Sequence, residues 1–231
     1  MSEMKIMKLM GKTSYHCIHG DVDFTKKEFY ETCGFKLEIG VNPVSELGFG
    51  TIVWEAALGL CQYFEKEGIR FSNKKVIELG AGTGIVSILA ALLGGDVTIT
   101  DKPKLLNQIE RNVSFNIPSS FKLQVKVRAL RWGRDHPLFP SDYDYILGSD
   151  ILYFPQNIPL ILETLLHLSN EKTIVYFAST MFYSPKLISQ AYLTLSQYFE
   201  TELVCRCEVK DVNIYRMTDK TPTTTSPQFI E

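Results

Sequence analysis

A glycine-rich loop between two apolar segments is the feature that most constrains this chain. Residues 75–79 read Lys-Val-Ile-Glu-Leu and predict a buried strand, residues 80–84 read Gly-Ala-Gly-Thr-Gly, and residues 85–93 predict a buried helix. Glycines at such a turn let the backbone approach a ligand closely, and the first turn of the helix offers unpaired N–H groups to an anion. The loop therefore predicts a ligand site at the start of an α/β unit.

The spacing of the glycines separates two kinds of ligand. A dinucleotide-binding loop has the pattern G-x-G-x-x-G. Counting from Gly80 and Gly82, the third glycine position is Ile85, so this pattern fails. The order E-x-G-x-G-x-G, with Glu78 before the loop, is instead typical of methyltransferases. In these enzymes the loop faces the methionine carboxylate of the cofactor, and the acid suits its ammonium, directly or through water.

A second acid follows the next strand. Residues 97–100 predict that strand, which ends at Asp101. A carboxylate at this position can accept hydrogen bonds from both ribose hydroxyls of an adenosine. Without a ligand, the loop would be only a tight turn and Asp101 a helix cap. The glycine loop, Glu78 and Asp101 together, in the right topological order, favour a cofactor site.

Predicted strands and helices alternate along most of the chain. Such alternation predicts an α/β fold with a mostly parallel sheet covered by helices on both faces. The last two strands are too close in sequence for a helical crossover, so we expect them to pair antiparallel. The expected strands are residues 35–39, 75–79, 97–100, 123–130, 143–148, 173–178, 202–207 and 212–217, and the expected helices are 53–67, 85–93, 104–116, 158–168 and 185–199.

This order sets the expected domain organisation. The seven strands from residue 75 onward predict a Rossmann-like sheet of the class I methyltransferase kind. We expect one domain over residues 35–217, preceded by an N-terminal arm, residues 1–34, that shows no clear periodicity. Residues 218–231 are rich in Thr and Pro and predict a disordered tail.

Composition narrows the class of protein further. The chain has 231 residues, 45% of them hydrophobic and 22% charged, as in an ordinary globular domain. A formal net charge of −2 without a long basic run argues against nucleic-acid binding. No apolar run reaches the roughly 18 residues that span a bilayer, and residues 1–12 do not resemble a secretory signal, so we expect a cytoplasmic protein. Its five cysteines are then free thiols, and their spacing predicts no metal site.

A third acid follows the fourth strand of the predicted sheet. Residues 148–153 read Gly-Ser-Asp-Ile-Leu-Tyr. Ligands of open α/β sheets bind outside the carboxyl ends of the strands, so Glu78, Asp101 and Asp150 should converge on one crevice. The alternative is that Asp150 caps the next helix and Tyr153 is a core aromatic residue.

These motifs resemble a known enzyme family. The pattern Asp150-x-x-Tyr153, with Val53-Trp54-x-x-Ala57 upstream and Leu130-Arg131-Trp132-Gly133 between, resembles the methyltransferase-like 21 group of the family 16 protein lysine methyltransferases. The resemblance covers roughly residues 50–217 and is closest to a branch that acts on elongation factor 1-alpha. It implies methyl transfer from S-adenosyl-L-methionine to a lysine of that protein, with S-adenosyl-L-homocysteine as product and no metal.

The resemblance also implies which residues contact the substrate and which contact the cofactor. Asp150 and Tyr153 would orient the substrate lysine, and Ser149 stands where relatives often have alanine. Without the resemblance, Trp54 and Trp132 could be ordinary core residues. The residues implied to line the cofactor pocket are Trp54, Gly80, Ala81, Gly82, Asp101, Trp132 and Ser149, with Glu78 added from the loop pattern.

Three other functions remain open from the sequence. The substrate could be a chaperone of the heat-shock 70 class. The enzyme could act on a small molecule or a nucleic acid, although no N-P-P-Y-type loop follows the fourth strand. The fold could also serve as a partner-binding module without catalysis, but intact Glu78, Asp101 and Asp150 argue against such decay. We expect the protein to be a monomer.

Overall fold

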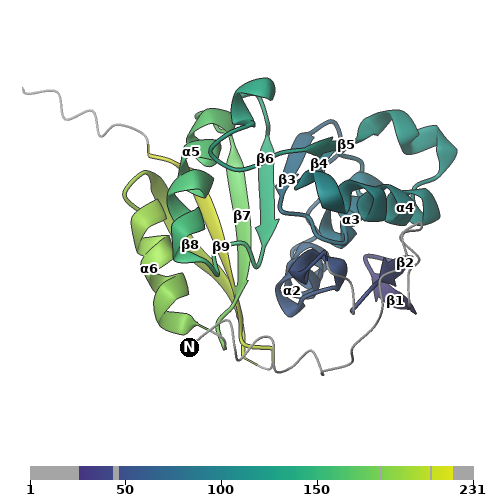
Figure 1. Ribbon diagram of the computed structural model, residues 1–231, viewed down its shortest axis with the longest axis horizontal. Helices are drawn as coiled ribbons and strands as arrows, with labels where there is room; N and C mark the ends of the chain where they lie inside the picture. Colours follow the sequence, from purple (N-terminus) through teal and green to yellow (C-terminus); the bar gives the residue numbers. More distant parts are fainter. Residues whose placement is uncertain (1–25, 44–46, 183, 209, 221–231) are drawn as a thin grey trace, which may run out of the picture.

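A seven-stranded sheet forms the centre of the molecule. The computed structural model describes residues 26–43, 47–182, 184–208 and 210–220. Across the sheet the strand order is β5-β4-β3-β6-β7-β9-β8 (Figure 1). The strands are β3 (Lys75–Leu79), β4 (Asp96–Asp101), β5 (Val125–Ala129), β6 (Tyr145–Ser149), β7 (Ile174–Thr180), β8 (Phe199–Cys207) and β9 (Val212–Asp219).

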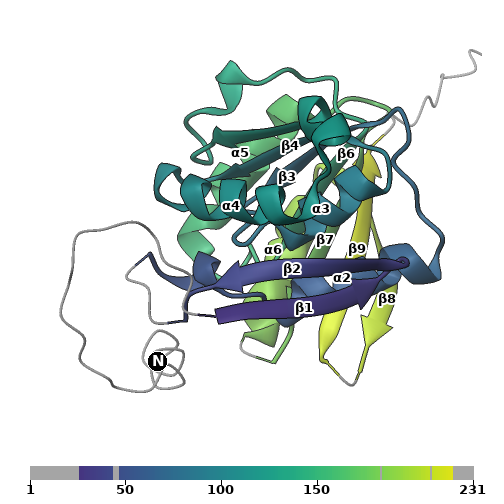
Figure 2. The ribbon, with the colours of Figure 1, turned by 90° about the vertical axis from the view of Figure 1, so that its right-hand side faces the viewer.

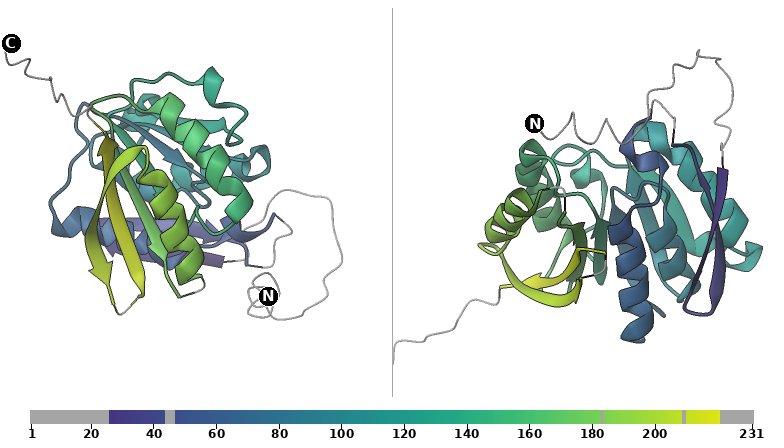
Figure 3. Two further views of the ribbon diagram at one scale, coloured as in Figure 1. Left: turned by 90° about the vertical axis from the view of Figure 1, so that its left-hand side faces the viewer. Right: turned by 90° about the horizontal axis from the view of Figure 1, so that it is seen from below.

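The pairing of these strands confirms the predicted sheet. Strands β5, β4, β3, β6 and β7 are parallel to one another. Strand β9 is antiparallel to both β7 and β8, as expected from the short connection between the last two strands. Figure 3 shows β8 and β9 at one edge of the sheet, on the side away from the N-terminal hairpin. The carboxyl ends of β3, β4, β6 and β7 consequently meet along one edge.

Helices cover both faces of the sheet and enclose two hydrophobic cores. One face carries α2 (Glu55–Lys66), α3 (Ile85–Leu92) and α4 (Leu106–Asn116), and the other carries α5 (Ile158–Leu168) and α6 (Pro185–Leu195) (Figure 1). Phe64, Ile88 and Ile109 belong to the first core, whereas Ile161 and Leu195 belong to the second. No helix among the described residues is long and apolar enough to cross a membrane.

An N-terminal hairpin packs against the first helical layer. Its strands are β1 (Lys26–Thr32) and β2 (Phe35–Val41), paired antiparallel. Figure 2 shows the hairpin beside α4 and α2, and both helices contact it. The expected arm, residues 1–34, therefore contains a strand. Its alternation was missed because charged side chains lie on both faces of β1: Lys26 and Glu28 share a face with the buried Thr32, and Lys27 and Glu31 lie on the exposed face. The predicted tail, residues 218–231, begins too early, because β9 continues to Asp219. Residues 1–25 and 221–231 lie outside the described part of the chain.

Candidate active site

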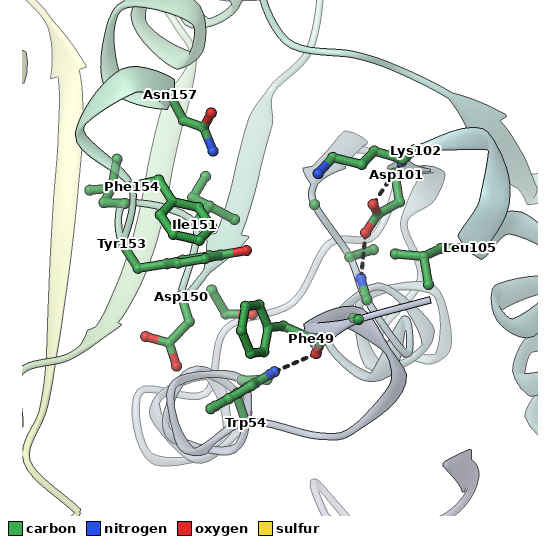
Figure 4. A pocket seen from close by; sticks show the side chains of 18 of the residues that line it. Phe49, Trp54, Asp101, Lys102, Leu105, Asp150, Ile151, Tyr153, Phe154 and Asn157 are labelled. Atoms are coloured by element: carbon green, nitrogen blue, oxygen red, sulfur yellow. Dashed lines mark hydrogen bonds between the residues drawn. The ribbon is translucent and has the colours of Figure 1, made fainter. Parts of the chain in front are cut away.

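A cavity of about 430 Å³ opens at the carboxyl ends of the central strands. It lies between the glycine loop after β3, the end of β4, and the segments that follow β6 and β7 (Figure 4). Nine of the ten predicted site residues line it, and Glu78 does not. The nine are Trp54, Gly80, Ala81, Gly82, Asp101, Trp132, Ser149, Asp150 and Tyr153.

The glycine loop lies so close to neighbouring segments that side chains at Gly80 and Gly82 would collide with them. Gly80 and Gly82 have positive φ values of 65° and 59°. A methyl group on Gly80 would lie 2.9 Å from atoms of both Trp132 and Ile151. One on Gly82 would lie 3.3 Å from the carbonyl oxygen of Gly50. Glycine is thus required by both backbone conformation and space.

Asp101 is fixed by backbone donors. Its Oδ2 accepts a hydrogen bond from the N–H of Gly82 at 2.8 Å, and its Oδ1 accepts one from the N–H of Lys102 at 2.7 Å. Burial raises the pKa of the Asp101 carboxyl, and these two bonds oppose the rise. Helix α4 has no side-chain cap, so Asp101 is not the helix cap considered above. A carboxylate can accept about four hydrogen bonds, and acceptor capacity therefore remains for a ligand.

Glu78 faces the interior beneath the loop instead of the cavity. Its Oε2 accepts hydrogen bonds from the backbone N–H of Ser87, at 3.0 Å, and from the Ser87 hydroxyl. Ser87 lies in the first turn of α3, so Glu78 satisfies a free donor at the start of that helix. The other oxygen, Oε1, is buried and has no hydrogen-bond partner among the described residues. Burial raises the pKa of Glu78 to about 8.

Aromatic side chains form the wall opposite the glycine loop. The indole N–H of Trp54 donates to the carbonyl oxygen of Phe49 at 2.7 Å, and the two rings meet edge to face at 6.1 Å between centroids. The Phe49 ring also meets Tyr153 edge to face at 6.1 Å, and Tyr153 contacts Phe154 (Figure 4). Sequence reasoning missed Phe49, although the flanking Gly48 and Gly50 marked a loop close to Trp54.

Asp150 lies in a strained loop after β6. Its backbone is left-handed, with φ 50°. Oδ1 accepts a hydrogen bond from the N–H of Thr180 at 2.7 Å, and Oδ2 accepts one from the Thr180 hydroxyl at 2.8 Å. The next helix, α5, begins at Ile158 after Asn157, so Asp150 does not cap it. The backbone N–H of Ala56 also favours the ionised carboxylate, which places Asp150 next to the first turn of α2.

The geometry suits a ligand that combines a charged end with an apolar body. Backbone groups of the glycine loop and the Asp101 carboxylate offer polar contacts on one side, and Phe49, Trp54 and Tyr153 offer apolar surface on the other. Within the described residues, no group of three His, Cys, Asp or Glu side chains could hold a metal ion. This arrangement fits the sulfonium cofactor that the glycine pattern predicts. Its amino-acid and adenosine ends need both polar contacts and apolar surface, and the cavity offers both.

Solved structures with the same architecture include a methyltransferase. A TehB-like SAM-dependent methyltransferase from Corynebacterium glutamicum superposes with a TM-score of 0.53 at 13% identity, covering 74% of this chain and 90% of that one. The PH0226 protein from Pyrococcus horikoshii gives a TM-score of 0.56 at 14% identity, covering 72% and 89%. These similarities confirm the Rossmann-like class I methyltransferase fold.

Sequence comparison identifies the family. EEF1A lysine methyltransferase 3 of Xenopus tropicalis is 45% identical over 84% of this chain and 86% of its own length. The mouse protein of the same name is 50% identical over 80% and 78%. Protein N-lysine methyltransferase METTL21A of Xenopus tropicalis is 49% identical over 60% and 64%. A family model described as lysine methyltransferase matches residues 36–195. The chain therefore belongs to this lysine methyltransferase family, as its motifs predicted.

Proposed function

We propose that this enzyme transfers a methyl group from S-adenosyl-L-methionine to a lysine of elongation factor 1-alpha. The observation that carries the proposal is that one cavity joins the glycine loop and Asp101 to Asp150 and Tyr153. A cofactor site and a site for a cationic side chain therefore lie in the same cavity. The relatives named EEF1A lysine methyltransferase 3, at 45% and 50% identity, support the choice of substrate.

The residues assigned to the cofactor lie on the β3 and β4 side of the cavity. Gly80, Ala81 and Gly82 would accommodate its amino-acid end, and Asp101 its ribose. Trp54, Trp132 and Ser149 would line the remainder. When bound, the cofactor supplies an activated methyl group on a sulfonium, and S-adenosyl-L-homocysteine is the product. Because Glu78 lies behind the loop, any contact it makes with the cofactor ammonium would be indirect.

Asp150 and Tyr153 are assigned to the substrate lysine. Free lysine has a pKa near 10.4, so almost all of it is an ammonium at neutral pH and lacks the lone pair needed for attack. The Asp150 carboxylate attracts and orients this cation but cannot lower its pKa. Aromatic surfaces such as Phe49 and Tyr153 desolvate the cation and thereby do lower it. Alignment of the two reactants then supplies much of the acceleration, on the order of 7–11 kcal/mol at best.

Methylation of purified candidate proteins tests the proposal. We expect tritium from labelled cofactor to enter elongation factor 1-alpha in preference to a chaperone of the heat-shock 70 class, and to be lost when the acceptor lysine is changed to arginine. Preferential labelling of the chaperone would assign that alternative substrate instead. In a parallel reaction with cell lysate, label that nuclease removes would indicate a nucleic acid, and no labelling despite cofactor binding would favour the non-catalytic module.

The proposal extends to the state of the enzyme in the cell. We propose a cytoplasmic monomer without direct nucleic-acid binding, in keeping with the net charge of −2. Light scattering of the purified protein should give the mass of one chain, 26.3 kDa. A fluorescent fusion should be found in the cytoplasm with its substrate.

A further inference from the structure

Thr180 holds both oxygens of the Asp150 carboxylate. It is the last residue of β7, it lines the cavity, and it donates to Oδ1 through its backbone N–H and to Oδ2 through its hydroxyl. The strands bring the two residues together, because Ser149 of β6 pairs with Ala178 of β7 and the N–H of Asp150 donates to the carbonyl oxygen of Ala178. Two bonds from one residue fix the plane of the carboxylate as well as its position.

The backbone of Asp150 requires such an anchor. A left-handed backbone is unfavourable for a residue with a side chain, and aspartate adopts it when its carboxylate is held by local hydrogen bonds. The two Thr180 bonds oppose this cost, and the hydrogen bond from a neutral donor to a carboxylate is among the stronger kinds. Without the hydroxyl, Oδ2 would lose the hydrogen bond from Thr180 and the carboxylate could rotate away from the cavity.

We propose that Thr180 is a positioning residue that orients Asp150 toward the substrate lysine. This inference rests on the proposed function. A carboxylate accepts about four hydrogen bonds. Thr180 occupies two of these positions and the first turn of α2 contributes the N–H of Ala56, so capacity for one further donor, the lysine ammonium, remains.

Thr180 also helps to keep Asp150 ionised. Burial raises the pKa of Asp150, and the two hydrogen bonds from Thr180 lower it. Glu55, in the first turn of α2, raises it through repulsion, while Tyr153 and Tyr192 of α6 face the same carboxylate. Loss of the hydroxyl should therefore move the pKa of Asp150 further upward and weaken its attraction for a cation.

Three variants separate positioning from stability. Thr180→Val removes the hydroxyl while keeping the branched shape and the backbone N–H, and Thr180→Ser restores the hydroxyl. Thr173→Val is the matched control, because this buried threonine just before β7 donates its hydroxyl to the carbonyl oxygen of Tyr143 and does not line the cavity. Each is assayed for melting temperature, S-adenosyl-L-homocysteine affinity, and kcat and KM with elongation factor 1-alpha.

We expect Thr180→Val to lower kcat/KM about tenfold, equivalent to about 1.4 kcal/mol, with cofactor affinity within about twofold of wild type. Thr180→Ser should recover most of the loss, and Thr173→Val should lower only the melting temperature. Carboxyl carbon NMR of the free enzyme, with the Asp150 signal assigned from Asp150→Asn, should show a higher Asp150 pKa in Thr180→Val alone. If Thr180→Val does not fold, Thr180→Ala carries the same expectations.

The outcomes distinguish this inference from the proposed function. Wild-type kcat/KM and an unchanged Asp150 pKa in Thr180→Val, together with an inactive Asp150→Ala, would overturn the role of Thr180 and leave the proposed function intact. An equal loss of kcat/KM in Thr173→Val would also overturn it. If wild-type enzyme methylates no protein, the proposed function fails, and the NMR titration alone then decides whether Thr180 controls Asp150.

Discussion

Gly80 is the residue at which the loop geometry is most exacting. Alanine there would combine a positive φ with contacts of 2.9 Å to Trp132 and Ile151. Gly68 is a matched control, because its φ is 63° and no atom of the described part of the chain lies within 4 Å of an added methyl group. We expect Gly80→Ala to weaken S-adenosyl-L-homocysteine binding at least tenfold, about 1.4 kcal/mol. Gly68→Ala should cost roughly 1–2 kcal/mol of stability and leave affinity unchanged. Calorimetry measures the affinity, and chemical denaturation measures the stability. Equal affinities of Gly80→Ala and Gly68→Ala would contradict the packing argument.

Asp150 and Tyr153 allow chemistry to be separated from cofactor binding. Asp150→Ala should leave S-adenosyl-L-methionine affinity within a few-fold of wild type and cut turnover by about a hundredfold or more, since each tenfold corresponds to about 1.4 kcal/mol. Tyr153→Phe should be milder, because it keeps the ring that contacts Phe49 and Phe154. Turnover, affinity and melting temperature are measured on one preparation. A destabilised Asp150→Ala enzyme with full specific activity would show that the carboxylate only braces α2 and β7.

The residues that sequence reasoning located are those that follow strands. Asp101 and Asp150 were predicted because parallel strands deliver their carboxyl ends to one edge, and both line the cavity. Glu78 lies within β3, before the strand ends. It was expected near the cofactor, but its side chain points to the face of the sheet that carries α3 and bonds Ser87 there. Phe49 and Thr180 had no motif to mark them. Their roles depend on tertiary contacts that spacing alone does not encode.

Among the elements, the N-terminal hairpin shows what the sequence concealed. The unpaired edge of β2 is satisfied by side chains of α4 instead of a neighbouring strand. Asn112 exchanges hydrogen bonds with the N–H and carbonyl of Gly40, and Asn116 does the same with Glu38. Asparagines four residues apart lie on one helix face, but nothing in their spacing reveals that they substitute for a strand. Helix α4 thereby connects the hairpin to the cofactor side of the cavity.

Asn112 should be the critical residue of this connection. Besides Gly40, it donates to the carbonyl oxygen of Thr83 in the glycine loop at 2.9 Å. Asn112→Ala leaves buried polar groups unpaired at about 1–3 kcal/mol each, so we expect at least about 2 kcal/mol of destabilisation and a several-fold loss of cofactor affinity. Ser114→Ala, on the exposed face of the same helix, should change stability by no more than about 0.5 kcal/mol. Urea denaturation compares them. Similar stabilities would mean that water replaces the Asn112 contacts.

On the scale of the whole molecule, the alternation of strands and helices was sufficient to predict the sheet. The alternation could not predict the strand order, which places β3 between β4 and β6 and thereby positions the site. Strands β4 and β5 lie on one side of β3, and β6 and β7 lie on the other, so the glycine loop after β3 faces Asp101 from one neighbour and Asp150 from the other. The two proposed functions, cofactor binding and lysine orientation, thus lie on opposite sides of one strand.

Glu78 should make the stability of the whole enzyme depend on pH. Its pKa is raised from 4.5 to about 8 by burial. Between these values the folded state keeps a proton that the unfolded state has lost, so the free energy of unfolding falls as pH rises, by about 1.4 kcal/mol per pH unit. Below pH 4.5 and above pH 8 this contribution is constant.

Glu78→Gln isolates the effect, because glutamine resembles the protonated carboxyl and does not titrate. The stability difference between the variant and wild type should be small near pH 5 and grow in favour of the variant by several kcal/mol toward pH 8. Asp101 and Asp150 also have raised pKa values, but they titrate in both proteins and largely cancel in the difference. Urea denaturation of the cofactor-free proteins at pH 5, 6, 7 and 8 measures it. A difference independent of pH would show that Glu78 is ionised in the folded protein throughout this range.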